Sequence, residues 1–564
     1  MNAAKFFISL ILGLLLCFFP TWKGMLNAPT PETSLDALKP LAIQLDGRKK
    51  PLDTVARETV TQLHGSLTYQ PLSGDKLDYL QIYTSLLFNN RDWNEEPFIL
   101  FSYRPLKTEL GLNPEQKYFS FAELVSSTLS SQILEAREAQ AQELDLTRSQ
   151  RESLTLEDRL ALILETVGSS SLPIVPHPED VKGKWLGIGQ AQEMYAGEKV
   201  EALQQTYLQI KQDILVRNNA GLEAKVRSLQ QQLIDLSPNV YPPAAQLNRE
   251  VRFYGLHLFT QAWILYGLAF VVMLCSLWRK PLEGYWSAIG FFTSGLAVHT
   301  YGFWERMQIA GRPPVTNMYE SVIWVSLGIA AIALIFELIH RAKYYLISAA
   351  PLSVLCLVLA DRLPAVLDPS IKPLVPVLRD NFWLSVHVPT ITLGYASFAL
   401  AFGLGHILLG TYLLQPERKE LTARLSRWNY NILQVGTLLL TTGIILGGIW
   451  AHFSWGRFWG WDPKETWALI ALMCYIVPLH GRLAGWLGNF GMAIASVVSF
   501  NAILMAWYGV NFVLGTGLHS YGFTTGGSEL IVASLIGLDL LFVTIVVLRH
   551  QFAIEDSVSS RKAI

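Results

Sequence analysis

Long apolar segments follow one another through the second half of this chain, and each is about as long as a helix that crosses a lipid bilayer. They lie near residues 256–278, 284–302, 319–339, 344–361, 386–413, 431–450, 466–485, 488–510 and 527–548. A bilayer requires about 20 apolar residues per helix, and in lipid only helices or closed barrels satisfy every backbone polar group. With a further apolar run at residues 5–20, the sequence predicts an all-α polytopic membrane protein with about ten transmembrane helices.

A polar region separates the first apolar run from the others. Residues 24–252 have a mostly helical pattern, and we expect them to form an extracytoplasmic helical domain inserted after the first helix. Within this region, the stretches 198–217 and 221–236 are rich in Glu, Gln, Lys and Leu at helical spacing. Asn218 and Asn219 interrupt them, which predicts a helical hairpin.

These patterns divide the chain into four parts. We expect an N-terminal anchor or signal-like helix at 1–23, the extracytoplasmic helical domain at 24–252, a transmembrane domain at 253–550 and a cytoplasmic tail at 551–564. We favour an uncleaved anchor for the first part. A cleaved signal peptide is the alternative, because the apolar run is short.

Positive charges predict how the apolar segments are oriented. Lysines and arginines collect in alternate connections, at 279–280, 340–343, 417–427, Arg482 and 549–562. Because positive residues favour the cytoplasmic side of a membrane, these connections should face the cytoplasm. The polar region, the connections at 303–318, 362–382 and 511–526, and the connection that holds the tryptophan-rich segment at 455–470 should then share the outer face of the cytoplasmic (inner) membrane.

Two features of composition exclude other kinds of site. The net charge of −1 and the lack of a basic stripe with interleaved aromatic residues give no indication of nucleic-acid binding. The cysteines all fall inside apolar segments, at Cys17, Cys275, Cys356 and Cys474. The polar region therefore has neither a disulfide framework nor a thiolate metal site.

The most informative local pattern is a tryptophan-rich segment at 455–470, with the sequence WGRFWGWDPKETWALI. It places Trp455, Trp459, Trp461 and Trp467 in a short loop between two apolar runs on the expected outer side. Tryptophan has a wide, rigid, stackable surface with one polar N–H, so the loop suits a planar macrocyclic ligand. An aromatic belt at the membrane surface is the alternative, although belts are scattered rather than ordered in this way.

The same segment contains a helix start. Asp462 and Pro463 are typical of an N-cap followed by proline in the first turn, and Glu465 lies three residues after Asp462, as in a capping box. We therefore expect Asp462 to begin the helix that carries His480.

The segment resembles the "WWD" signature WGxxWxWDxxExxxLI of heme-handling membrane proteins that mature c-type cytochromes. The wider resemblance is to the CcsA/ResC component of system II cytochrome c synthase, and it covers about 284–548. It is strong at 299–320, 381–398, 447–480 and 511–522. Residues 45–54 are similar to the stretch that joins the two halves of fused CcsB–CcsA synthases. The resemblance does not extend to the ResB-like half, so it implies a separate ResB/CcsB-like membrane subunit.

The resemblance implies heme as the bound group and assigns ligands to it. In the family, one histidine before and one after the tryptophan segment ligate heme at the outer surface, and His387 and His519 match these positions by context. His480 matches the transmembrane histidine that holds heme on its way outward. His406 is expected at a depth similar to that of His480 and is a candidate second ligand there, although in the family that ligand belongs to the companion half.

Other polar residues are candidates for the outer pocket. His299 begins the family-like segment HTYGFWERMQIAGRP at 299–313 and is expected near the outer face, where it could line the pocket. Four cations could bind heme propionates, namely Arg306, Arg312, Arg457 and Lys464, because cationic side chains pair with carboxylates. Pairing with Glu305, Asp462 and Glu465 is the equal alternative.

The reaction that the resemblance implies is the addition of two thiols of an apocytochrome c Cys-x-x-Cys-His motif across the heme vinyl groups. The substrate brings its own nucleophiles, so no side chain of this chain needs a catalytic role beyond orientation. A thiol-reducing partner is then expected. One alternative is a heme exporter or chaperone that delivers heme without forming thioethers, as CcmC-type relatives do, and another is a CcmF-type ligase component.

Overall fold

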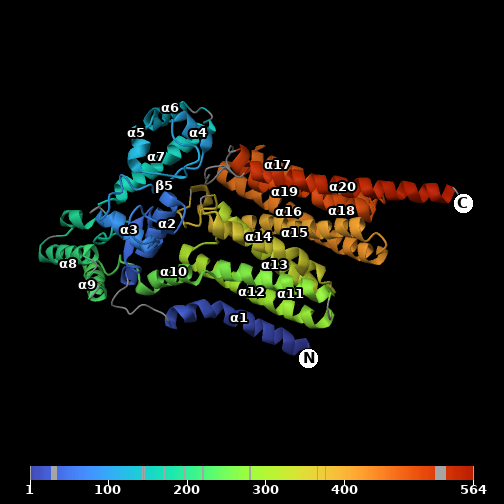
Figure 1. Cartoon of the computed structure of the whole chain (residues 1–564), viewed down its shortest axis with the longest axis horizontal. Coiled ribbons are helices and arrows are strands. Elements are labelled where there is room, and N and C mark those ends of the chain that lie inside the picture. Colours follow the sequence, from blue (N-terminus) through green and yellow to red (C-terminus); the bar gives the residue numbers. More distant parts are fainter. Residues whose placement is uncertain are drawn as a thin grey trace. The chain divides into compact units, whose positions relative to one another are not determined.

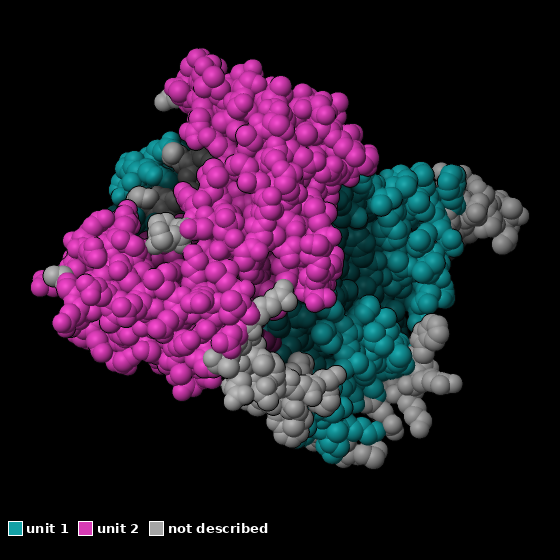
Figure 2. Space-filling model, turned by 60° about the vertical axis from the view of Figure 1, so that its left-hand side comes forward, with its two compact units in different colours: residues 1–20, 257–369, 374–564 teal, residues 21–256, 370–373 magenta. Residues whose placement is uncertain are grey.

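The computed structural model describes residues 2–26, 35–142, 144, 146–168, 172–195, 197–216, 218, 221–278, 281–364, 366–374, 376–514 and 529–562. The chain divides into two compact units, coloured separately in Figure 2. Unit 1 contains Met1–Pro20, His257–Pro369 and Leu374–Ile564. Unit 2 contains Thr21–Leu256 and Ser370–Pro373.

Unit 1 is built from helices, and the prediction of an all-α polytopic membrane protein is confirmed. Its helices after residue 257 are α11 (Leu258–Trp278), α12 (Pro281–Ala310), α13 (Met318–His340), α14 (Tyr344–Arg362), η4 (Pro376–Arg379), α15 (Asn381–Leu414), α16 (Lys419–Trp455), α17 (Pro463–Leu483), α18 (Asn489–Val498), α19 (Phe500–Leu504), η5 (Met505–Leu514) and α20 (Glu529–Lys562). The element η5 has π-helical hydrogen bonding and continues directly from α19.

Eight helices in the described part of the chain are long and apolar enough to cross a membrane. They are the run Ala244–Leu277, which includes α11, together with α13, α14, α15, α16, α17, the run Asn489–Leu514 and residues Leu530–Phe552 of α20. Two of the ten expected segments are not among them. In α1 (Asn2–Leu26) the apolar part is the short Ala4–Leu16, and α12 carries His299, Glu305 and Arg306 within its 30 residues.

Two helices are longer than expected, and both extensions bear on the site. Asp380 caps α15, and its carboxylate accepts hydrogen bonds from the backbone N–H groups of Phe382 and Trp383. His387 therefore lies within α15 and not at its start. At the other boundary, α16 continues to Trp455 and ends where Gly456 adopts a left-handed conformation, with φ of 71°, which glycine adopts without a steric penalty.

The helix α15 lies at the centre of unit 1 and contacts α16, α13, α18 and α20 (Figure 1). Small residues allow α15 and α16 to approach closely. A Cβ atom added at Gly394 would lie 3.0 Å from the backbone nitrogen of Leu440, and one added at Gly443 would lie 2.6 Å from Cβ of Ile391. Close backbone approach at glycine is the usual way in which helices associate within lipid.

Unit 2 is mostly helical, as its sequence pattern indicated. Its elements are β1 (Ala42–Leu45), β2 (Arg48–Pro51), α2 (Leu52–His64), β3 (Thr68–Tyr69), β4 (Leu77–Asp78), α3 (Tyr79–Phe88), β5 (Ile99–Leu100), α4 (Arg104–Glu109), β6 (Tyr118–Phe119), α5 (Phe121–Ser126), α6 (Leu129–Ala141), α7 (Arg148–Thr166), α8 (Glu198–Leu215), α9 (Leu222–Leu236) and α10 (Ala244–Leu256), with short 3-10 turns η2 (Leu35–Leu38) and η3 (Ile188–Glu193). Within the described residues of unit 2, the three sheets are antiparallel pairs, namely β1–β2, β3–β4 and β5–β6.

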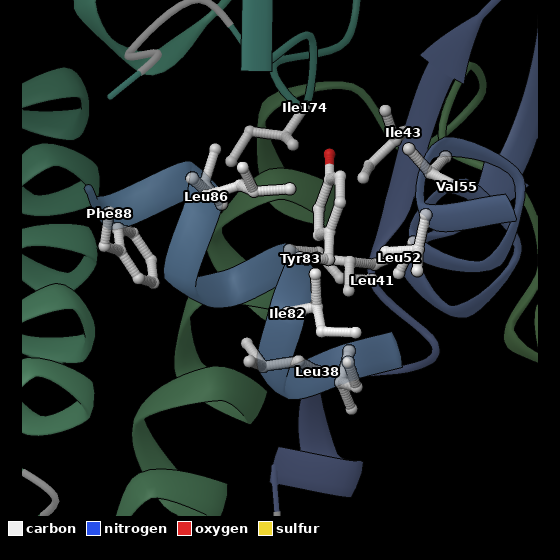
Figure 3. Packing of buried hydrophobic residues seen from close by; sticks show 14 of the residues in the cluster. Leu38, Leu41, Ile43, Leu52, Val55, Ile82, Tyr83, Leu86, Phe88 and Ile174 are labelled. Atoms are coloured by element: carbon white, nitrogen blue, oxygen red, sulfur yellow. The ribbon is translucent and has the colours of Figure 1, made fainter. Parts of the chain in front are cut away.

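One hydrophobic core joins the helices of unit 2. Figure 3 shows Tyr83 of α3 within a group of apolar side chains that includes Ile43 of β1 and Val55 of α2. Ile174, from the segment after α7, belongs to the same core. The expected helical hairpin is confirmed, because α8 and α9 pack against each other on either side of the interruption.

Candidate functional site

A cavity lies in unit 1 where α15, α16, α17 and η5 meet the segment between α12 and α13. We call it the tryptophan-loop cavity. Its empty volume is about 1410 Å³, part of which is open to solvent. The lining residues are Val315, Thr316, Asn317, Met318, Ser321, Leu378, Leu384, His387, Val388, Ile391, Thr392, Tyr395, Ile444, Gly447, Gly448, Trp450, Ala451, Ser454, Trp455, Phe458, Trp459, Lys464, Glu465, Ala468, Trp507, Asn511 and Phe512. Mostly apolar walls with a few polar groups are typical of a small-molecule site.

Among the residues that the structure describes, His387 is the histidine that lines this cavity. Its Nδ1 lies 2.9 Å from the carbonyl oxygen of Gly443 on α16. A carbonyl oxygen only accepts, so Nδ1 donates, and the neutral imidazole carries its lone pair on Nε2. A second hydrogen bond that fixes the tautomer and the ring plane is the usual arrangement for a metal-ligating histidine. The ring also meets Trp450 edge to face, with centroids 5.8 Å apart.

Glycines on α16 make room for this arrangement. A Cβ atom at Gly447 would lie 2.6 Å from Cε1 of His387, and one at Gly448 would lie 2.5 Å from Cζ of Phe458. Any larger residue would push the imidazole or the phenyl ring away from α16. We did not identify Gly443, Gly447 and Gly448 from the sequence, although small residues spaced four apart on an apolar helix are a known signal of close packing.

The tryptophans take four different positions. Trp455 ends α16 and lines the cavity, and Trp459 lines it from the loop. Trp461 is 69% exposed, has a positive φ of 57°, and meets Trp459 edge to face with centroids 5.8 Å apart. Trp467 lies on α17 and is not among the lining residues. The expectation of four tryptophans in one loop is therefore wrong, because α16 continues to Trp455 and α17 begins at Pro463.

The helix start predicted at Asp462 is confirmed. The Asp462 carboxylate accepts a hydrogen bond from the backbone N–H of Lys464, 3.0 Å away, and completes a capping box with Glu465. Glu465 Oε2 accepts from the backbone nitrogens of Gly460 at 2.8 Å and Asp462 at 3.2 Å. These bonds satisfy N–H groups that a helix N-terminus leaves unpaired. They also connect the start of α17 to the tryptophan loop, which is the segment 456–462 between α16 and α17.

The candidate cations differ sharply in surroundings. Arg306 is buried and donates to Glu320 from Nε and Nη2, at 3.1 and 2.9 Å. Nη1 of Arg312 lies 3.6 Å from the same carboxylate and 2.7 Å from Oγ1 of Thr316, to which it donates. The sequence analysis did not single out Glu320, although an acidic residue in an apolar segment is a signal of function. This ion pair holds the segment that forms one wall of the cavity, since Thr316 is a lining residue.

The other two cations belong to the tryptophan loop and its helix. Arg457 is exposed and is not among the lining residues. Lys464 lines the cavity directly.

The other histidines lie elsewhere. His299 is fully buried, with Nδ1 3.3 Å from the Tyr266 hydroxyl, and does not line the cavity. His480 is exposed in the last turns of α17, and its Nδ1 donates to the Ile476 carbonyl at 2.9 Å. His519 lies outside the described residues.

His406 has an ionisable partner that the sequence analysis missed. Its Nε2 lies 2.6 Å from Oδ1 of Asp539 on α20, and its Nδ1 donates to the Phe402 carbonyl at 2.9 Å. Asp539 is an acidic residue within an apolar span, and such a residue is a functional candidate by default. That signal was present in the sequence. Both nitrogens of His406 are engaged, so in this arrangement the imidazole is not set up to ligate a metal.

The walls of the cavity provide groups that suit a heme. Trp455 and Trp459 provide flat apolar surface, and His387 provides an imidazole with a fixed tautomer. Neutral imidazole is a common axial ligand of heme iron. Lys464 adds a positive charge. The group of residues therefore suits a flat, largely apolar ligand that carries a metal and an acidic group.

Known proteins resemble this chain over the residues that form the cavity. Residues 315–519 match the family model described as "Cytochrome C assembly protein". The protein NrfI of Wolinella succinogenes is 31% identical over 493 residues, which are 84% of this chain and 53% of NrfI, so the chain spans about half the length of that relative. A cytochrome c biogenesis protein CcsA of Prochlorococcus marinus (strain NATL1A) is 34% identical over 298 residues, which are 45% of this chain and 92% of that protein. The chain therefore belongs to the CcsA family of cytochrome c biogenesis proteins.

Proposed function

We propose that this protein binds heme in the tryptophan-loop cavity and presents it for covalent attachment to apocytochrome c. The observation that carries the proposal is the meeting of Trp455, Trp459 and His387 around one cavity in the part of the chain that matches the family model. Heme is here the substrate that the protein handles.

Each residue would have a separate role in binding the heme. Trp455 and Trp459 hold the macrocycle by its flat faces, and His387 binds the iron through Nε2. His519, which lies outside the described residues, would supply a second ligand to the iron. The histidine of the Cys-x-x-Cys-His motif then displaces one of these ligands, which helps to release the product.

The attachment needs no nucleophile from this chain. Each thioether forms when a cysteine S–H adds across a vinyl C=C bond. The sulfur bonds to one carbon and the hydrogen is placed on the other, so the step itself requires no oxidant. The thiols must be reduced beforehand, and a thiol-reducing partner supplies that condition. Orientation of the reacting groups is the protein's contribution, and it can lower a barrier by several kcal/mol.

A ResB/CcsB-like membrane subunit completes the synthase. His480 supports this part of the proposal, because it lies on an apolar helix and its side chain is exposed. An imidazole that is exposed on an apolar helix can bind a heme that is shared with a neighbouring subunit. We assign His480 to the delivery of heme toward the outer site.

The membrane orientation follows from the distribution of positive charge. Residues 24–252, the tryptophan loop and the cavity face the outer side of the cytoplasmic membrane, and the tail at 551–564 faces the cytoplasm. Reporter fusions at positions 120, 315, 420 and 460 test this. Activity of a periplasm-only reporter at 420, or its absence at 460, would contradict the orientation.

Reconstitution tests the activity. The full chain is produced with and without a ResB-like subunit, together with an apocytochrome c reporter, and heme on the reporter is detected after denaturing electrophoresis. We expect covalently bound heme only when both membrane proteins are present. Heme that reaches the reporter but is lost on denaturation would instead identify an exporter or chaperone. Purified protein without heme in either case would contradict the proposal as a whole.

A further inference from the structure

Lys464 is the cationic side chain among the residues that line the tryptophan-loop cavity. It occupies the second position of α17, and its ammonium group is close enough to Asn511 for a weak hydrogen bond, with Nζ 3.4 Å from Oδ1. An ammonium has three donors, and a distance of 3.4 Å is longer than the usual range for such a bond. The partner is also a neutral amide of η5, so the charge of Lys464 is not balanced by that contact.

The neighbouring carboxylates of Asp462 and Glu465 bind backbone N–H groups and not the ammonium group of Lys464. Glu465 Oε2 accepts from the backbone N–H groups of Gly460 and Asp462, and Asp462 Oδ1 accepts from the backbone N–H of Lys464. Both acids therefore accept hydrogen bonds at the start of α17, and the charge of Asp462 acts on Lys464 without a direct ion pair. In the part of the chain that the structure describes, Lys464 has no carboxylate oxygen within 4.0 Å. Placing an ammonium against apolar walls is costly unless an anion compensates it.

We infer that Lys464 binds a carboxylate of the macrocycle and so sets the rotation of the ring within the cavity. This inference rests on the proposed function and deepens it. Aromatic walls fix the plane of a flat ligand but leave it free to turn within that plane. A charge-assisted hydrogen bond at the rim removes this freedom. A ring held at its iron by His387 and at its acidic edge by Lys464 cannot turn in its plane, so the pyrrole rings that carry the vinyl groups lie on the side away from Lys464.

The other cations are less suited to this role. Arg306 and Arg312 are engaged with Glu320, and neither lines the cavity. The guanidinium of Arg457 packs against the backbone of its own loop, because a Cβ atom at Gly460 would lie 2.0 Å from its Nη1. Arg457 is exposed and provides a matched control from the same segment.

The test compares two ligands that differ in whether their two propionate groups are free carboxylates or neutral methyl esters. Ferric protoporphyrin IX has two free carboxylates, and its dimethyl ester has none. Both are titrated into the detergent-solubilised full chain as wild type, Lys464→Met, Lys464→Arg and Arg457→Gln, and binding is followed by the Soret absorbance. We expect Lys464→Met to weaken the diacid by about tenfold or more, the size expected for a charge-assisted hydrogen bond. The ester should bind the wild type and this variant within about twofold of each other.

The controls separate folding from recognition. Normal ester binding by Lys464→Met shows that the cavity is intact, and Lys464→Arg should retain most of the affinity for the diacid. Arg457→Gln should bind both ligands as the wild type does. Equal weakening of both ligands by Lys464→Met, or no weakening of the diacid, overturns the inference while leaving the proposed function standing. If the wild type binds neither ligand, the proposed function itself fails.

Discussion

The imidazole of His387 donates a hydrogen bond from Nδ1 to the carbonyl oxygen of Gly443, 2.9 Å away on the neighbouring helix. This bond connects α15 to α16 and selects the tautomer whose Nε2 can bind iron. It exists because both helices are closely packed at glycine. The geometry of the proposed ligand is therefore determined by a helix that carries no ligand itself.

Gly447 should be as important for heme binding as a residue next to the metal. In Gly447→Ala, the new methyl group would meet Cε1 of His387 at 2.6 Å, so the ring must turn away from α16. We expect the affinity for heme to fall by about tenfold or more, as when an outer partner of a metal ligand is lost. Heme titration of the purified variant measures this.

Gly410→Ala is the matched control, since a Cβ atom at that position of α15 has no neighbour within 4 Å. It should bind heme as the wild type does. Equal affinities for Gly447→Ala and the wild type would show that the packing does not position His387.

Glu320 should be essential for the stability of unit 1. Its carboxylate forms ion pairs with two buried arginines, Arg306 and Arg312. It also accepts hydrogen bonds from the backbone N–H and the hydroxyl of Thr316. Removing one member of a buried ion pair leaves a charge uncompensated and costs about 3–5 kcal/mol. We expect Glu320→Gln to lower the free energy of unfolding by that amount, measured by denaturation in detergent micelles. The exposed Glu417→Gln should change it little, and equal stabilities of the two variants would refute the structural role of Glu320.

Local features of this protein could be predicted from the sequence. The apolar segments, the hairpin at 198–236 and the capping box of Asp462 and Glu465 depend on residues close together in the chain. Periodicity and capping rules act over such distances. The start of α17 was placed correctly for this reason.

Long-range partners could not be predicted in the same way. His406 and Asp539 are 133 residues apart, and the carbonyl of Gly443 is 56 residues from His387. These contacts depend on how the helices pack, which no local rule determines. The limits of the tryptophan loop were misplaced because Trp455 continues α16 until Gly456 ends it. Apolar composition alone does not show where a membrane helix stops.

His406 should not be a heme ligand. One of its nitrogens donates to the Phe402 carbonyl and the other lies 2.6 Å from Asp539, so neither is placed to bind iron. We expect His406→Gln to retain the heme spectrum of the wild type, while His480→Gln loses the heme associated with delivery. Spectra of both variants, purified with the ResB-like subunit, measure this. Loss of a heme population in His406→Gln would contradict the assignment.

Unit 2 should lose stability as the pH falls below about 6.5. Burial between Phe98 and Tyr118 lowers the pKa of His64, against the opposing effect of its hydrogen bond to the Phe98 carbonyl. The folded state therefore keeps this imidazole neutral, and the unfolded state gains a proton first. The stabilisation is complete above the unfolded pKa and decreases as the pH falls below it.

Hydrogen–deuterium exchange of peptides from α2, corrected for intrinsic rates, measures this loss between pH 7.5 and 5.5. In His64→Gln the decrease should disappear, because the titrating group is gone. An unchanged pH dependence in that variant would assign the effect to other residues.

The central claim is that His387 binds heme iron in the tryptophan-loop cavity, and the reduced absorption spectrum of His387→Gly tests it most directly. We expect the purified variant to show a much weaker Soret band, and added imidazole to restore it by occupying the space of the deleted side chain. His452→Gly, at an exposed histidine of α16 outside the cavity lining, should have the wild-type spectrum. A normal Soret band and full cytochrome c maturation by His387→Gly without imidazole would contradict the account.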